Sequence, residues 1–175
     1  MKNLFSFLTV LVAIFMLASV VTAKSHSGRD DSSKFNDRDK VKWSIEKVRD
    51  ATEKYKNVNR AIKDGYAPTD FFVPNMGFHY VKEKLVDGKV NALTPEVLLY
   101  VPTKKGLKLV GVEYLSTDVR SSLFGRTFDP ANTEAGIPPS LHAWIWERNP
   151  DGMFTPFNPK IGNGPGGETG THQGH

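Results

Sequence analysis

Two histidines lie inside stretches that are otherwise apolar and aromatic, and they are the side chains best suited to chemistry in this sequence. His79 stands in residues 76–82 (M-G-F-H-Y-V-K), and His142 stands in residues 140–150 (S-L-H-A-W-I-W-E-R-N-P), beside two of the three tryptophans. If both stretches are strands, each imidazole is buried, and a buried imidazole needs a partner for its ring nitrogens. That partner is a protein group, a metal ion or a ligand.

Glu113 is the carboxylate best placed to join them. It ends an apolar row, so either the strand emerges into water there or the carboxylate points into a pocket. If the three strands are neighbours, His79, His142 and Glu113 converge. Two imidazoles and one carboxylate suit zinc, copper or non-haem iron, with positions left open for water or substrate. Met76, three residues before His79, would add a soft ligand that favours copper. In the alternative interpretation, a backbone carbonyl or a tyrosine satisfies each histidine.

The same stretches also fit a binding module for a small apolar or aromatic ligand. Aromatic side chains would form the pocket walls, and the histidines would orient the ligand by hydrogen bonds. The candidate pocket residues are Tyr80, Trp144, Trp146 and Met76, with Phe72 and Phe78 as further walls. A hydrolase with His142 as general base is a third hypothesis, but the sequence identifies neither its nucleophile nor its substrate, so enzymatic activity stays an open question.

One amphipathic helix, over residues 41–64, is the element that the sequence predicts most clearly. Apolar side chains recur there every three or four residues, and charged side chains fill the opposite face. Gly65 is a natural C-terminal stop. We expect Trp43 and Tyr55 to be core anchors of this helix.

Four stretches have the pattern of strands: residues 76–82, 95–101, 107–115 and 140–150. Gly106 is expected to supply the positive φ of the hairpin turn between the middle two. Residues 66–75 are predicted to be an aromatic loop, and residues 116–139 a lid or binding loop over the pocket. The predicted fold is α+β, with one N-terminal amphipathic helix packed on a curved, mainly antiparallel sheet or small barrel.

Strict alternation along the strands predicts which side chains share a face of the sheet. His142 should share one with Trp144 and Trp146. His79 should lie on the face opposite to Phe78 and Tyr80. Glu113 should stand in one row with three residues of its own strand, namely Leu107, Leu109 and Gly111.

The two ends of the chain differ in character from its middle. Residues 1–23 have the basic start, apolar run and small final residue of a secretory signal peptide, and an uncleaved transmembrane anchor is the alternative. The predicted organisation is a signal peptide over 1–23, a disordered linker over 24–40, a single α+β domain over 41–159 and a disordered glycine-rich tail over 160–175. We therefore expect a secreted or periplasmic protein.

Composition excludes several classes of function. The 175 residues include no cysteine, which excludes a disulfide scaffold, a thiol enzyme and haem attached through C-x-x-C-H. The net charge of +4 is spread over interspersed bases and acids, so we expect no nucleic-acid partner. No stretch after residue 23 is apolar enough to cross a membrane. The expected partner is a metal ion or a small-molecule ligand, and the sequence identifies no protein partner.

Several blocks of the chain together resemble a family of small exported bacterial proteins of unknown function. The blocks are M-G-F-H-Y-V (76–81), P-E-V-L-L-Y (95–100), L-V-G-V-E-Y (109–114) and L-H-A-W-I-W-E-R-N-P-D-G-M-F (141–154). The resemblance covers residues 41–159 and implies a bacterial, extracytoplasmic setting. It implies no activity, so the roles expected for His79, Glu113 and His142 come from the residues themselves.

Overall fold

The computed structural model describes residues 37–164. The predicted signal peptide (1–23), residues 24–36 of the predicted linker and residues 165–175 of the predicted tail lie outside the described residues. The helical segments are α1 (Asp37–Thr52), the 3-10 helix η2 (Glu53–Lys56), α2 (Val58–Lys63) and the 3-10 helix η3 (Glu83–Leu85). The strands are β1 (Ala67–Val73), β2 (Gly77–Val81), β3 (Val97–Thr103), β4 (Gly106–Leu115), β5 (Ser122–Leu123), β6 (Arg126–Thr127) and β7 (Ser140–Ala143). Within residues 37–164, no helix combines the length and apolar character needed to cross a bilayer.

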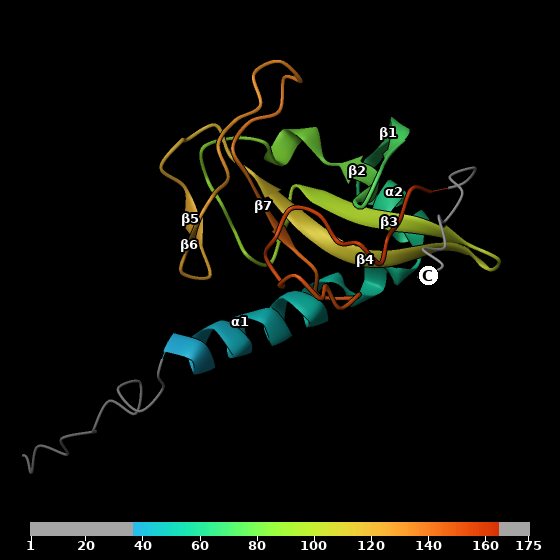
Figure 1. Ribbon diagram of the computed structural model, residues 1–175, viewed down its shortest axis with the longest axis horizontal. Helices are drawn as coiled ribbons and strands as arrows, with labels where there is room; N and C mark the ends of the chain where they lie inside the picture. Colours follow the sequence, from blue (N-terminus) through green and yellow to red (C-terminus); the bar gives the residue numbers. More distant parts are fainter. Residues whose placement is uncertain (1–36, 165–175) are drawn as a thin grey trace, which may run out of the picture. The chain divides into compact units, whose positions relative to one another are not determined.

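Five strands form one open antiparallel sheet, in the order β1-β2-β3-β4-β7, and β5 and β6 pair in a separate small hairpin. The N-terminal helical segments pack on one face of the large sheet, where they share a core with β2, β3, β4 and β7. The C-terminal segment crosses the other face, where Ile161 packs on a second, smaller core (Figure 1). The α+β prediction is confirmed, and the packed part of the chain continues beyond residue 159.

The helix predicted over residues 41–64 starts earlier and is interrupted. It begins at Asp37, changes to the tighter η2 after Thr52, and resumes as α2. Tyr55 is buried, as predicted, but Trp43 is 60% exposed, so its prediction as a core anchor was wrong. Trp43 is two residues from the buried Ile45, which places it about 200° around the helix from the packed face.

The predicted aromatic loop over residues 66–75 is instead the edge strand β1 (Ala67–Val73). The prolines that favoured a loop are compatible with this position, because an edge strand has N–H groups that need no partner in the sheet. Pro68 pairs with Tyr80 and Phe72 with Phe78, and the register shifts between the two pairs. A bulged edge strand therefore replaces the expected loop.

One extra residue in β4 changes which side chains face each side of the sheet. Leu99 of β3 pairs with Gly111, but the next residue, Tyr100, pairs with Leu109, which leaves Val110 without a partner in the ladder. Such an insertion is a β-bulge, and it reverses the alternation on one side of the bulge relative to the other.

The predicted row of Leu107, Leu109, Gly111 and Glu113 is therefore wrong on one side of the bulge. Leu107 and Leu109 pack on the helix side with Val112 and Tyr114. Glu113 alternates with Val112 and lies on the opposite face. The hairpin turn itself is as predicted, since Gly106 has a φ of 107°.

The last strand is shorter than predicted, because β7 ends at Ala143 rather than near residue 150. Beyond it, the Trp146 and Glu147 N–H groups both donate to the carbonyl of Val110, at 3.1 and 2.9 Å, so the chain leaves strand geometry opposite the bulge. Trp146 consequently turns to the helix side, where its Nε1 donates to Thr52 Oγ1 at 3.2 Å. The prediction that Trp146 shares a face with His142 was wrong.

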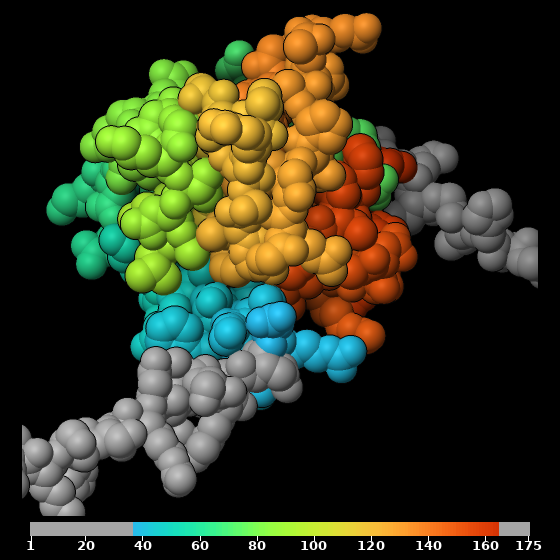
Figure 2. Space-filling model, turned by 90° about the vertical axis from the view of Figure 1, so that its left-hand side faces the viewer, coloured from blue at the N-terminus to red at the C-terminus, as the bar shows by residue number. Residues whose placement is uncertain are grey.

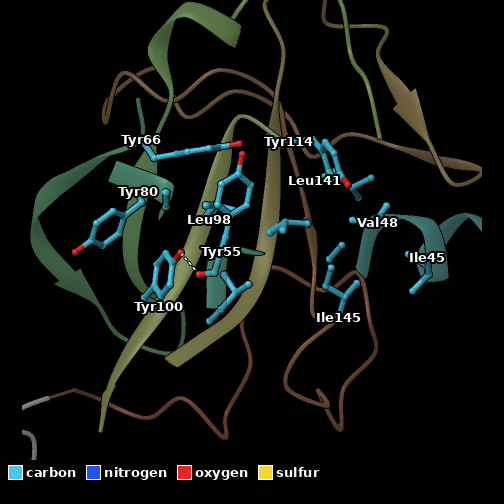
Figure 3. Packing of buried hydrophobic residues seen from close by; sticks show 14 of the residues in the cluster. Ile45, Val48, Tyr55, Tyr66, Tyr80, Leu98, Tyr100, Tyr114, Leu141 and Ile145 are labelled. Atoms are coloured by element: carbon cyan, nitrogen blue, oxygen red, sulfur yellow. Dashed lines mark hydrogen bonds between the residues drawn. The ribbon is translucent and has the colours of Figure 1, made fainter. Parts of the chain in front are cut away.

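The helix-side core is rich in tyrosines whose hydroxyls reach backbone carbonyls (Figure 3). Tyr100 donates to the Tyr55 carbonyl at 2.6 Å, Tyr66 to Pro95 at 2.7 Å, and Tyr114 to Ala92 at 2.8 Å. A buried hydroxyl has to find such a partner, and these bonds tie the loops and the end of the helical segment to the sheet.

We predict that Tyr100→Phe lowers the free energy of unfolding by about 1 kcal/mol, because it removes the hydroxyl bond to Tyr55 while keeping the ring. Tyr80→Phe is the matched control. Tyr80 packs on Tyr100, and its hydroxyl makes no hydrogen bond to another described residue. Urea unfolding of both variants checks the prediction, and equal effects would contradict it.

Glu96 generates a second prediction, on the pH dependence of stability. This carboxyl is 1% exposed, accepts the Leu115 N–H at 3.1 Å, and has its pKa raised from 4.5 to about 7, chiefly by burial. The unfolded chain releases this proton at a lower pH than the folded protein does, so stability should fall as the pH rises from about 4.5 to about 7. Glu96→Gln should flatten that fall in urea unfolding at pH 5 and pH 8. An unchanged difference between the two pH values would contradict the assignment.

Candidate metal centre

Three strands bring His79, Glu113 and His142 together on the sheet face that is turned away from the helices. Glu113 of β4 and His142 of β7 are direct cross-strand partners. His79 comes from β2, where it pairs with Leu99 of the intervening β3, and Val97 of β3 pairs with Glu113. Direct partners project to the same face of a sheet, so the three side chains meet above β3 and β4.

The separations between the three side chains suit an ion better than direct hydrogen bonds. His79 Nε2 lies 3.6 Å from Glu113 Oε2, and His142 Nε2 lies 3.7 Å from Glu113 Oε1. One potential ligand atom from each residue lies within 4.8 Å of the other two. A protein N–H···O bond spans about 2.7–3.2 Å. Two ligands of a tetrahedral zinc ion, each about 2.1 Å from it, are about 3.4 Å apart. The two separations between histidine and Glu113 are close to that spacing.

The triad is buried, and it leaves polar atoms without partners. The side chains of His79, Glu113 and His142 are 14%, 6% and 3% exposed. Within residues 37–164, neither ring nitrogen of His142 has a hydrogen-bond partner. Buried polar atoms without partners are rare in native proteins and need an explanation. The interpretation in which a backbone carbonyl or a tyrosine satisfies His142 is therefore wrong.

Burial keeps the two imidazoles neutral. It lowers the pKa of His142 to about 4, and Asp129 opposes the shift. It also lowers the pKa of His79, against the opposing effect of the Glu113 carboxylate. Burial raises the pKa of Glu113, which His79 and a hydrogen bond from Ser140 counteract. A neutral imidazole has the free lone pair that a metal ion requires.

Trp144 closes one side of the triad. Its ring stacks on His142 at a centroid distance of 5.9 Å and an interplanar angle of 21°, and its Nε1 donates to the Thr155 carbonyl at 2.7 Å. The ring has room because Gly111 lies beneath it, where a Cβ would come within 3.2 Å of Trp144 Cε3. The bulge and the glycine thus provide the space that this tryptophan occupies.

The four residues predicted to line a ligand pocket are divided between the two faces of the sheet. Trp144 lies with the triad, whereas Tyr80 and Trp146 pack against the helix-side core. Met76 lies half-buried in the turn before β2. Tyr80 and Trp146 therefore cannot wall one pocket together with His79 and His142.

Residues 116–139, expected to cover the pocket, lie beside the sheet at its β7 edge. Phe128 packs into the helix-side core, and Asp129 pairs with Ser140. The segment spreads over one side of the molecule above α1 (Figure 2). Sequence reasoning missed both Asp129 and Ser140. The position of Ser140, two residues before His142 in a strand, was the only signal, since it places both on one face.

No protein-family model, curated protein or solved structure matches this chain significantly.

We predict that Glu113→Gln raises the free energy of unfolding of the metal-free protein at pH 8, by about 1–3 kcal/mol. The substitution replaces a buried carboxyl between two neutral imidazoles by a neutral amide of nearly the same shape. Urea unfolding in the presence of a chelator measures the effect, with Glu46→Gln on the exposed side of α1 as the matched control. A loss of stability would show that the protein alone already satisfies Glu113.

Proposed function

We propose that this protein binds one transition-metal ion through His79, Glu113 and His142. The observation that carries the proposal is the convergence of three potential ligand atoms in a buried place where, among the described residues, neither ring nitrogen of His142 has a hydrogen-bond partner. A bound ion would satisfy His142 Nε2 and would offset part of the free-energy cost of burying the three side chains.

Zinc suits this set of ligands best. Two imidazole nitrogens and one carboxylate oxygen are typical zinc ligands, and a four-coordinate ion would have one position left for water or another small ligand. The thioether of Met76, which would favour copper, belongs to the turn before β2 and not to the three strands that carry the triad. Iron sites of the two-histidine, one-carboxylate type need several open positions, and the burial of this triad gives them little room. Copper and iron rank after zinc for these reasons.

We also infer that the protein works outside the cytoplasm, in the periplasm or as a secreted protein. The support is the sequence of residues 1–23, with its basic start, long apolar run and final small residue. The resemblance to small exported bacterial proteins supports the same setting.

We predict that the untagged protein expressed without residues 1–23 binds one zinc ion per chain, measured by elemental analysis and calorimetric titration. The double variant His79→Ala, His142→Ala should lose this binding. The other three histidines provide the matched control, because a variant with all of them changed to alanine should still bind one ion: His26, His172 and His175.

Zinc should also stabilise the fold. At a free concentration 100-fold above the dissociation constant it adds about 2.7 kcal/mol, which raises the melting temperature of a protein of this size by about 5–10 °C. Equal binding by the double variant and the wild type would place the metal elsewhere and refute the proposal. A wild-type protein that stays empty of zinc, copper and iron would refute it as well.

A further inference from the structure

Asp129 lies on the same face of the sheet as the triad, just beyond its edge strand. It forms a two-residue bridge with Ser140, in which the Asp129 N–H donates to Ser140 O at 2.7 Å and the Ser140 N–H donates to Asp129 O at 3.1 Å. Ser140 and His142 alternate on β7 and share the face of Glu113. Because direct partners share a face, Asp129 stands beside Ser140 and diagonal to His142.

The imidazole of His142 has one nitrogen for the metal and one that needs an acceptor. Its Nε2 faces Glu113 on β4. The second nitrogen, Nδ1, lies on the other side of the ring from Nε2's neighbour Cδ2, and it is buried without a hydrogen-bond partner within residues 37–164. For Nε2 to present a lone pair to an ion, Nδ1 has to carry the proton and donate it.

The carboxylate of Asp129 is available as that acceptor. It is half-buried, and no donor within residues 37–164 makes a hydrogen bond or ion pair to it. It raises the pKa of both His142 and Glu113, so its charge acts on the triad. Asp129 does not belong to the group of three residues whose potential ligand atoms lie within 4.8 Å of one another. This argues that it contacts a metal ligand rather than the metal itself.

We propose that Asp129 is a positioning residue for the metal centre: its carboxylate accepts the Nδ1–H of His142, directly or through one water, and so fixes the tautomer that presents Nε2 to the ion. Metal-bound histidines almost always donate their second N–H to a carboxylate, a backbone carbonyl or water. This inference rests on the proposed metal-binding function.

The test compares Asp129→Ala and Asp129→Asn with the wild type and with Asp50→Ala, which removes an equal charge from the exposed side of α1. Competition with a chromophoric chelator should show that Asp129→Ala binds zinc about 10- to 100-fold more weakly. Asp129→Asn, which keeps an acceptor oxygen, should lose less affinity, and Asp50→Ala none.

Two further measurements separate positioning from a structural role. The Nδ1 proton of His142 should be visible by nitrogen-15 NMR in the zinc-loaded wild type and should exchange faster in Asp129→Ala. The absorption spectrum of the cobalt-loaded protein should also change in that variant. Wild-type affinity and spectra in Asp129→Ala would overturn the role of Asp129 while leaving the metal site intact. Absence of metal binding by the wild type would overturn both.

Discussion

The constraint on which the rest of the structure depends is the burial of a carboxyl group between two neutral imidazoles. Glu113 is 4% exposed and His142 is 3% exposed, on the sheet face that also carries the smaller apolar core of Val97, Leu99, Val110, Leu115 and Trp144. In such surroundings, each polar atom without a hydrogen bond costs about 1–3 kcal/mol. Ser140 donates a hydrogen bond to Glu113, whereas neither ring nitrogen of His142 has a partner within residues 37–164, so the cost of burial falls mainly on that histidine.

One face of the sheet carries the main hydrophobic core, and the other face carries the candidate metal site. The helix side holds the larger core, and three of its buried tyrosines donate to backbone carbonyls. The opposite face holds the smaller core, and within residues 37–164 the ring nitrogens of His142 lie there without a hydrogen-bond partner. A change at the site therefore leaves the main packing layer untouched, which allows such a face to keep unfavourable polar groups.

Local sequence patterns correctly predicted those features of the fold that depend only on residues close together in the chain. The α+β class, the turn at Gly106 and the opposite faces of His79 and Tyr80 all follow from periodicity or from a single backbone requirement. The bulge at Val110, the early end of β7 and the approach of Asp129 depend on how segments far apart in the chain pair, so no local pattern shows them. The wrong prediction for Trp43 could have been avoided from the sequence, because the helical spacing between Trp43 and Ile45 already places them on different faces.

The exposure of the three side chains also bears on what a bound ion can do. His142 is covered by the Trp144 ring and Glu113 lies between the histidines, so His79, at 14%, is the most exposed of the three. A catalytic zinc ion needs an open position that substrate can reach, whereas a structural one is enclosed by its ligands. With three protein ligands a bound zinc ion would keep one open position, and the burial of the triad would limit that position to water or a small molecule.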